Sequence, residues 1–349
     1  MTQPGWQVRD YPAMPAEVLK METYDDAILS RAESGAVYWD APNPRRSFVR
    51  GAVYDQRGAL INQSQRKGGM NSDMVLSVNP PVITSREIRE ATSARESGQW
   101  LYGGSWMHGF GHFLVETLPT LWPLLDSASE FIGICAHRFN SRKTYEWQYE
   151  IVGLLDVGEV RVIDDTPVSF EKLAVATRPY HYQVAIHPRA AMVWDKVSMA
   201  TDPLNDDSGA SPIYLSRTRF QRDMQSRGVA TGREFSNGND VDRVFADRGF
   251  TVIYPETLSV LEQIRLARAA PIIAGVAGSA LHLSVFAKPG ARVIEVGDAR
   301  TGGSLVATQR AISAVKEQPT AQIPYQGDSS GAVDLAHLKS TLDALSLRE

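Results

Sequence analysis

Strand-like and helix-like segments alternate through the second half of the chain, and this alternation constrains its fold more than any other feature. Short apolar runs, IYLSR, FTVIYP, PIIAGV and ARVIEV, are separated by amphipathic segments such as DVDRVFADRG and SVLEQIRLARA. Parallel strands need a crossover connection, usually a helix, so this alternation predicts a parallel sheet covered by helices. We therefore predict a doubly wound α/β domain over residues 213–320.

The first half shows the same alternation after a more irregular start. Up to about residue 99, short strand-like runs are broken by Pro and Gly, and beyond it FIGICA, VRVID and KLAVAT alternate with helical segments. We expect an N-terminal α/β domain over residues 1–200, joined to the second by a polar linker at 201–212. Residues 321–349 carry an amphipathic helical pattern that allows a return to the N-terminal domain.

Length, charge and cysteine content limit the partners and the compartment. The 349 residues, 43% of them hydrophobic, suffice for two globular domains, and a net charge of -4 gives no general attraction to nucleic acid or to an anionic membrane. The single Cys135 cannot form an internal disulfide, the N-terminal residues lack a signal-peptide pattern, and no apolar run is long enough for a membrane span. We expect a cytoplasmic protein with no transmembrane segment and no nucleic-acid partner.

The segment GGSWMHGFGHFLVETLP carries His108, His112 and Glu116 at helical spacing. Residues four apart share a helix face, so His112 and Glu116 can form a hydrogen bond, and a carboxylate raises the basicity of an imidazole. Such a pair can remove the proton of an attacking hydroxyl group. Two other interpretations stay open: a purely structural pair, and a metal site of all three residues, although these spacings climb about 12 Å of helix.

The turn in IIAGVAGSALHL carries Gly275 and Gly278 before a predicted helix. Glycines at such a turn let backbone N–H groups approach a phosphate, although they also serve close packing alone. Arg217 follows a predicted strand on the edge where ligands of open parallel sheets bind, and its guanidinium group suits a pyrophosphate. The nearby Arg222 and Arg227 fit a solvated basic loop better than a binding site.

Together these segments resemble glycosyltransferase family 61 in their order and spacing over about residues 100–296. Two positions depart from the family pattern: Gly109 stands where the family has Asn, and Ala277 where it has His in the glycine turn. The matching segments are GFGHFLVE with His112 and Glu116, YLSR ending at Arg217, the stretch with Arg233, Asn237 and Asp240, GVAGSAL, and PGARVIE ending at Glu295.

The resemblance implies a GT-B-like fold of two Rossmann-like domains, with the acceptor on the N-terminal side and the nucleotide-sugar on the C-terminal side. It implies inverting transfer from a UDP-linked donor to an oligosaccharide or lipid-linked saccharide in capsule or exopolysaccharide biosynthesis, with no metal or other cofactor. Either His112 or Glu116 can take the proton; we expect Glu116 as the base, with His112 positioning the acceptor and His108 and Trp106 in acceptor binding. The expected nucleotide-sugar-binding residues are Arg217, Arg219, Arg233, Asn237, Gly275, Gly278, Ser279, Ala280, Leu281 and Glu295.

Two other functions compete with sugar transfer. Because Ala277 and Gly109 replace family side chains, a nucleotide-sugar-binding protein with little or no turnover is one alternative. A metal-dependent hydrolase built on His108, His112 and Glu116 is the other.

Overall fold

The chain divides into two compact units. In the computed structural model, Pro12–Val197 form the N-terminal unit, and Ser198–Glu349 together with Met1–Tyr11 form the C-terminal unit. The division falls inside helix α5 (Arg189–Thr201), and most of the expected linker, residues 202–209, lies outside the described residues. The structure describes residues 5–8, 10–37, 46–66, 81–139, 143–201, 210–229, 235–298, 301, 304–327, 331–345 and 347.

The C-terminal unit is built on a parallel five-stranded sheet in the order β12-β11-β13-β14-β15. Numbered within the unit, this order is 2-1-3-4-5, the doubly wound order that the sequence predicts. All five residues of β13 are buried, as expected for a strand covered on both faces. The strands are β11 (Ile213–Leu215), β12 (Thr251–Ile253), β13 (Ile272–Val276), β14 (Arg292–Val296) and β15 (Thr320–Ile323).

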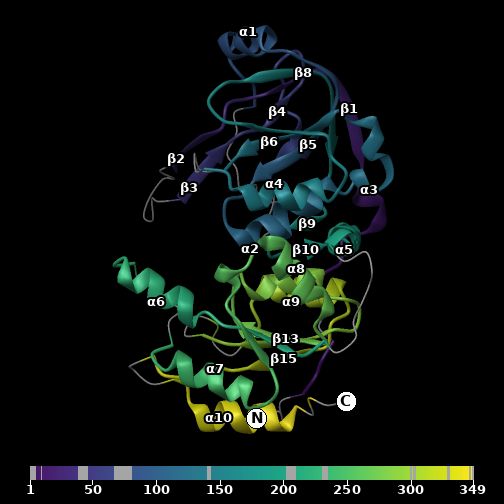
Figure 1. Ribbon diagram of the computed structural model, residues 1–349. Coiled ribbons are helices and arrows are strands. Elements are labelled where there is room, and N and C mark those ends of the chain that lie inside the picture. Colours follow the sequence, from purple (N-terminus) through teal and green to yellow (C-terminus); the bar gives the residue numbers. More distant parts are fainter. Residues whose placement is uncertain are drawn as a thin grey trace. The chain divides into compact units, whose positions relative to one another are not determined.

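Helices lie on both faces of this sheet, with α8 and α9 on one face and α7 and α10 on the other (Figure 1). Helix α8 starts at a capping box, in which the Ser259 and Glu262 side chains and backbone N–H groups bond reciprocally. The helices are α6 (Thr218–Ser226), α7 (Gly238–Ala246), α8 (Val260–Ala269), α9 (Ala307–Val315) and α10 (Leu335–Ala344), with 3-10 turns at Pro255–Thr257 and Leu281–Phe286.

Both ends of the chain pack into the C-terminal unit. Leu338 and Leu342 of α10 join the same buried cluster as Phe245 and Ile294, so the helix does not return to the N-terminal domain as the sequence allowed. The apolar face of α10 is satisfied by the sheet and α7 of its own unit. At the other end, the indole N–H of Trp6 donates to the Leu345 carbonyl at 2.7 Å, and the Arg292 guanidinium lies 4.9 Å from the Trp6 ring.

The N-terminal unit has a mixed six-stranded sheet in the order β4-β1-β8-β5-β6-β7. Strands β8, β5, β6 and β7 are parallel, whereas β1 runs antiparallel to both β8 and β4. The expected doubly wound pattern therefore applies only to part of this sheet. Antiparallel pairing needs no crossover helix, which fits the helix-poor start of the sequence. The strands are β1 (Met21–Leu29), β4 (Val53–Tyr54), β5 (Glu96–Trp106), β6 (Gly133–Arg138), β7 (Glu159–Ile163) and β8 (Val168–Ala176).

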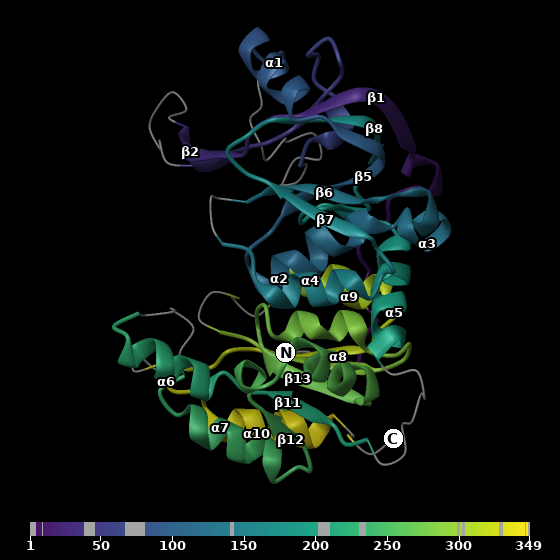
Figure 2. The ribbon, with the colours of Figure 1, turned by 45° about the horizontal axis from the view of Figure 1, so that its top comes forward.

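Helix α1 lies on one side of this sheet, and α2 and α4 lie on the other (Figure 2). Two short ribbons complete the unit, β2 (Glu33–Val37) with β3 (Arg46–Arg50), and β9 (Tyr180–His181) with β10 (Ala185–Ile186). The helices are α1 (Ser85–Ser93), α2 (Phe110–His112), α3 (Leu124–Ser127) and α4 (Glu146–Gly153), with a π turn at Phe113–Thr117 and 3-10 turns at Ala16–Val18, Asn62–Ser64, Leu118–Leu121 and Ala128–Glu130.

Candidate active site

In the C-terminal unit, the connections from the neighbouring parallel strands β11 and β13 leave in opposite directions, toward β12 and β14. Ligands of open α/β sheets bind at such a switch point, and Arg217 and Gly278 follow these two strands. In the N-terminal unit, β5 continues to its neighbour β6, whereas the chain leaves the sheet after β8. The segment with His112 follows β5, and Arg178 follows β8.

The helical segment after β5 changes its geometry twice. A single turn of α-helix ending at His112 is followed by the π turn Phe113–Thr117 and then by a 3-10 turn. Pro119 has no N–H to donate to the carbonyl four residues before it, so a regular α-helix cannot continue there. The Thr120 hydroxyl instead donates to the Glu116 carbonyl at 2.8 Å. The sequence predicts a kink at this place, and π turns are frequent at functional sites.

Glu116 is a buried carboxylate held by a cation and an imidazole. Its side chain is 5% exposed, and Arg66 donates from Nε to Oε2 at 2.6 Å and from Nη2 to Oε1 at 2.8 Å. His112 Nδ1–H donates to Oε1 at 2.6 Å. Burial alone raises the pKa of Glu116, but the Arg66 charge and the hydrogen bonds from His112 and Arg66 outweigh it and lower this pKa to about 2. Glu116 is therefore a firmly ionised group and a weak proton acceptor.

His112 is the exposed member of this group. Its side chain is 44% exposed, and its ring centroid lies 5.4 Å from that of Tyr182. Since Nδ1 donates to Glu116, the neutral ring carries its lone pair on Nε2, where it can accept a proton. The geometry thus favours the reverse of the sequence-based assignment: His112 suits the base, and Glu116 orients it.

Arg66 is a part of this site that the sequence reasoning missed. The guanidinium group pairs with Glu116 from 50 residues away in the chain, and it lies 5.7 Å from the Phe139 ring and 5.6 Å from the Tyr182 ring. His108, an expected acceptor residue, stacks on the same Phe139 ring at 6.0 Å. Phe139 therefore brings His108 close to the Arg66 side of the group.

Trp106 has to be removed from the expected acceptor residues. The indole is 1% exposed, its N–H donates to Gln148 Oε1 at 2.9 Å, and its ring packs against Phe113 and Tyr149. Because the ring is buried in the core, a sugar cannot stack on it. The Trp106 ring, which we expected to bind a sugar, instead packs β5 against the helical segments that carry Phe113 and Tyr149.

In the C-terminal unit, buried Asp242 organises the loop after β11. One oxygen of Asp242 accepts from the Ser216 hydroxyl at 2.7 Å and from the Thr218 hydroxyl at 3.2 Å, and the other accepts from Tyr254 at 3.0 Å. Ser216 and Thr218 flank Arg217, so this network fixes the backbone that presents the arginine. Arg217 is half-buried, with its guanidinium 5.3 Å from the Phe220 ring.

Gly275 and Gly278 lie in different surroundings. Gly275 lies within β13, not in the turn, and a Cβ atom there would contact Leu215 and Leu281 at 3.4 Å, so it serves close packing. Gly278 has φ 137°, a conformation that side-chain-bearing residues rarely adopt. Gly278, Ser279 and Ala280 are half-buried, and the turn leads into a 3-10 helix rather than the expected α-helix. A six-residue 3-10 segment offers less aligned dipole than a full helix.

The other expected nucleotide-sugar residues are scattered between surface and core. Arg219 is exposed on α6, and Arg233 lies outside the described residues. Leu281 and Glu295 are both fully buried, and Glu295 Oε1 accepts from the Val306 backbone at 2.9 Å. Asn237 forms two hydrogen bonds with the Val333 backbone. These three buried or backbone-bonded residues support the site from within and do not line it.

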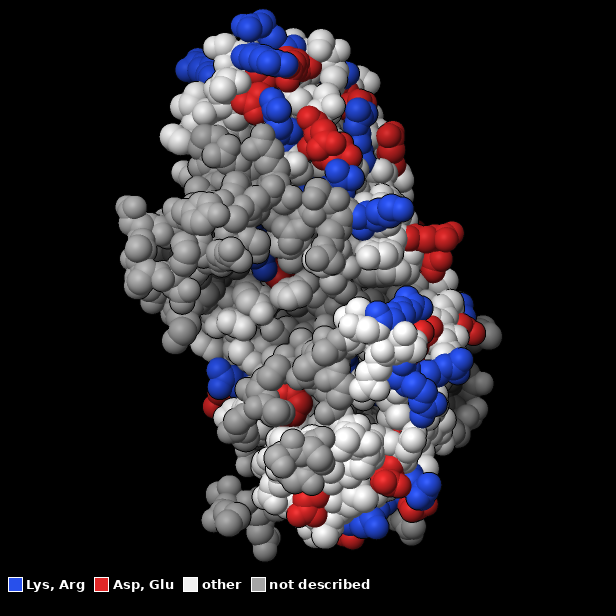
Figure 3. All heavy atoms as spheres, turned by 90° about the vertical axis from the view of Figure 1, so that its left-hand side faces the viewer, with Lys and Arg blue, Asp and Glu red and all other residues white. Residues whose placement is uncertain are grey.

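Neither a charge patch on the face in Figure 3 nor a metal-ligand cluster marks out a site among the described residues. On the face in Figure 3, the described Lys and Arg side chains are interspersed with Asp and Glu side chains. Within the described ranges, no three His, Cys, Asp or Glu residues converge as a metal site would require. The oxygens of Glu116 are already bonded to Arg66 and His112.

Comparison with known proteins identifies the family of the chain. The family model of glycosyltransferase 61 matches residues 110–294, from the helical segment after β5 to β14. The chain belongs to this family and is a glycosyltransferase of mixed α/β fold. Across the residues that the structure describes, no helix has the length and hydropathy of a membrane span.

Two further comparisons add less. The chain is similar to the crystal structure of the bacterial iron-containing dodecameric glycosyltransferase TibC from enterotoxigenic E. coli H10407, with 10% identity, a TM-score of 0.33, and coverage of 88% of this chain and 83% of that chain. A search of curated proteins gave no match.

Proposed function

We propose that the chain transfers a sugar, with inversion at the anomeric carbon, from a UDP-linked donor to a saccharide acceptor in polysaccharide biosynthesis. The observation that carries the proposal is the group of His112, Glu116 and Arg66, in which an exposed imidazole is oriented by a buried, ionised carboxylate. Such an imidazole suits general-base catalysis, which contributes about 10²–10⁴ in rate.

In this reaction the acceptor oxygen forms a bond to the anomeric carbon while the bond from that carbon to the phosphate oxygen breaks. His112 Nε2 takes the acceptor proton, and the nucleoside diphosphate leaves with the electron pair. Glu116 stabilises the imidazolium that forms, and Arg66 keeps Glu116 ionised. We place the leaving group at the β11/β13 switch point, where Arg217 and the amides around Gly278 can stabilise its charge. No metal is required by this scheme.

The GT-B arrangement is part of the proposal, because the base belongs to the N-terminal unit and the donor residues to the C-terminal unit. Transfer requires the two sites to face one another when both substrates are bound. Paired cysteines introduced near His112 and Gly278 should cross-link faster when UDP and acceptor are present, and failure to cross-link under any condition would contradict the arrangement.

The activity is tested by nucleotide release. Purified protein is incubated with a panel of nucleotide-sugars and saccharide acceptors, with and without a chelator, and the product anomer is read by NMR. We expect acceptor-dependent release of UDP, unchanged by the chelator, and an inverted anomeric centre. Loss of activity with the chelator would favour a metal-dependent hydrolase. Donor binding without turnover, unchanged in Glu116→Gln, would favour a binding protein, as the buried Ala277 in place of the family histidine suggests.

A further inference from the structure

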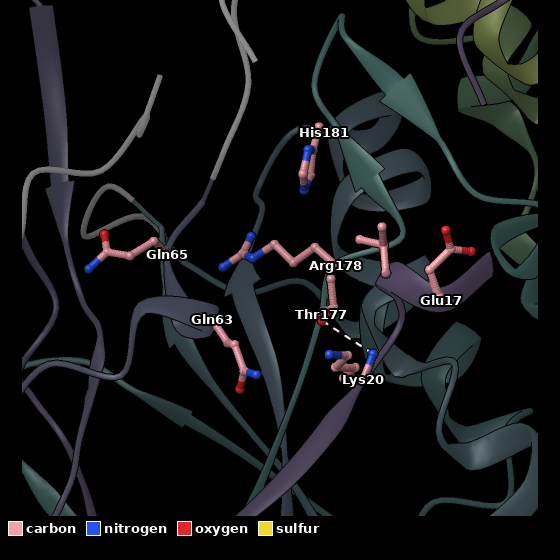
Figure 4. A pocket seen from close by; sticks show the side chains of 8 residues that line it. Glu17, Lys20, Gln63, Gln65, Thr177, Arg178 and His181 are labelled. Carbon is pink, nitrogen blue, oxygen red and sulfur yellow. Dashed lines mark hydrogen bonds between the residues drawn. The ribbon is translucent and has the colours of Figure 1, made fainter. Parts of the chain in front are cut away.

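A cavity of about 380 Å³ opens beside the His112 group, within the N-terminal unit. Figure 4 shows that it is formed by segments far apart in sequence: the end of β8, strand β9, the turn before β1, and the Asn62–Ser64 turn. The Lys20 backbone N–H donates to the Thr177 hydroxyl at 3.3 Å and joins two of these segments. The lining residues are Glu17, Val18, Lys20, Gln63, Gln65, Thr177, Arg178 and His181.

Arg178 is a buried cation at the base of this cavity. It is 7% exposed, and its hydrogen-bond partners are neutral oxygens: Nη2 donates to the Ser64 carbonyl at 3.2 Å, and the Tyr102 hydroxyl is also within bonding reach. Among the residues that the structure describes, no carboxylate forms an ion pair with Arg178. Glu116 attracts it only at longer range, because the Glu116 oxygens are bonded to Arg66 and His112. A buried cation without its own carboxylate is suited to receive an anion.

The backbone of β5 is shaped to admit this guanidinium. The pairing of β5 with β6 shifts register between Tyr102 and Ser105, which marks a bulge at Gly103 and Gly104. Gly104 has φ 76°, and a Cβ atom there would lie 3.1 Å from Arg178 Nη2. An alanine would be strained and would also press on the arginine. Gly104, the second glycine of the GGSW sequence, thus provides the space that Arg178 occupies.

The charges around the cavity are unequal. The cations Lys20 and Arg178 line it together with one carboxylate, Glu17, and with His181. In Figure 4 the Arg178 guanidinium extends toward Gln63 and Gln65, whereas Glu17 lies on the opposite side of the Arg178 backbone. Tyr182 connects the cavity with the proposed base. It follows His181, which lines the cavity, and it contacts both the His112 ring and Arg66.

We propose that this cavity binds the anionic group, a carboxylate or a phosphate, of a charged saccharide acceptor, with Arg178 as the receiving cation and Lys20 at the mouth. The assignment rests on the proposed function, since it names the acceptor class of the same site. An acceptor anchored there would present a neighbouring hydroxyl group to His112.

Binding of three probes to the full-length protein tests this assignment: a glucuronosyl disaccharide, its neutral glucosyl counterpart, and that counterpart carrying a 6-phosphate. Calorimetry should show tighter binding of at least one charged probe, weakened by added salt. Arg178→Gln should weaken it by on the order of 30- to 100-fold, and Lys20→Gln by about two- to five-fold. Lys172→Gln, an exposed lysine of β8, is the control and should change nothing. The two charged probes distinguish a carboxylate from a phosphate.

Lys20 is exposed, so Lys20→Gln keeps the test informative if Arg178→Gln does not fold. Equal affinity for charged and neutral probes, or charged-probe affinity unchanged in both variants, would overturn the assignment. UDP binding and UDP release are measured in parallel. Sugar transfer to neutral acceptors alone would refute the anionic subsite and leave the transferase intact. Charge-dependent binding that needs Lys20, without any transfer, would support the subsite and refute the transferase.

Discussion

The two units organise their candidate sites in opposite ways. The N-terminal unit uses charged side chains from distant parts of the chain, with Arg66 bound to Glu116 and Arg178 seated against Gly104. The C-terminal unit uses its backbone and hydroxyl groups, with Asp242 fixing the loop of Arg217 and Gly278 shaping the turn after β13. Proton transfer needs a fixed charge environment, whereas phosphate binding needs accessible N–H donors. We therefore expect substitutions in the N-terminal unit to lower kcat most strongly, and substitutions in the C-terminal unit to weaken donor binding most strongly.

Replacing the base should have the largest effect. We expect His112→Ala to lower kcat by about 10²–10⁴ while UDP affinity stays the same, because the imidazole acts in proton transfer and the donor residues belong to the other unit. Steady-state kinetics and calorimetry measure the two quantities. His337→Ala, in α10, is the control and should leave both unchanged. An equal loss of UDP affinity in His112→Ala would break the division of roles between the units.

Removing the partner of the buried carboxylate should affect stability next most strongly. Arg66→Ala leaves the buried Glu116 carboxylate without its guanidinium partner and with the His112 hydrogen bond alone, so we expect the free energy of unfolding to fall by about 3–5 kcal/mol. The double variant Arg66→Met with Glu116→Leu should recover most of this loss, since no unpaired charge remains. Urea denaturation provides the measurement. A double variant no more stable than Arg66→Ala would show that the two residues are not coupled.

Acid should weaken the N-terminal unit through buried His137. Tyr102 donates to its Nδ1 and its Nε2–H donates to the Ser30 carbonyl, both at 2.8 Å, so the folded protein holds the neutral ring. Burial lowers the pKa of His137 to about 4 from the model-compound value of 6.5. The unfolded chain therefore binds more protons between these values, and stability should fall by about 3 kcal/mol as pH drops from 6.5 through 4.

Below that range, Glu116 should contribute a second loss between pH 4.5 and 2, because its folded pKa is lowered. Denaturant titrations at several pH values test both windows. In His137→Gln the loss between pH 6.5 and 4 should shrink while the lower window persists. An unchanged slope in the upper window would assign that acid sensitivity to other groups.

We expect the smallest loss of stability from a substitution at Trp6, in the segment Met1–Tyr11 that packs into the C-terminal unit. Trp6→Ala removes the hydrogen bond to Leu345 and the contact with Arg292, and we expect the free energy of unfolding to fall by about 1–2 kcal/mol. Hydrogen exchange should show reduced protection of backbone amides in the C-terminal unit. Val8→Ala is the control: Val8 is exposed, and its replacement should change protection little. Protection lost instead in Pro12–Val197 would contradict the division into units.

The sequence predicted the C-terminal unit better than the N-terminal one for a physical reason. Strands β11 to β14 and their helices are read from local periodicity, and the place of Arg217 and Gly278 follows from parallel topology. Arg66 has no such signal, since its role depends on a tertiary contact with Glu116. Arg178 did carry a signal, because it follows β8 as Arg217 follows β11, and the same rule would have selected it. The prediction for Trp106 was wrong because the sequence around a tryptophan does not distinguish a core residue from one that stacks on a sugar.

The pairing of Trp6 with Leu345 has a consequence for how this protein is made. Ribosomes deliver the chain from its N-terminus, so Pro12–Val197 can complete their fold while Met1–Tyr11 still lack the sheet and helix that receive them. The C-terminal unit closes only when the last helix has emerged. A circular permutant that joins residue 349 to residue 1 and opens the chain between residues 201 and 210 would bring residues 210–349 and Met1–Tyr11 into one continuous stretch, and it should remove this waiting step from synthesis.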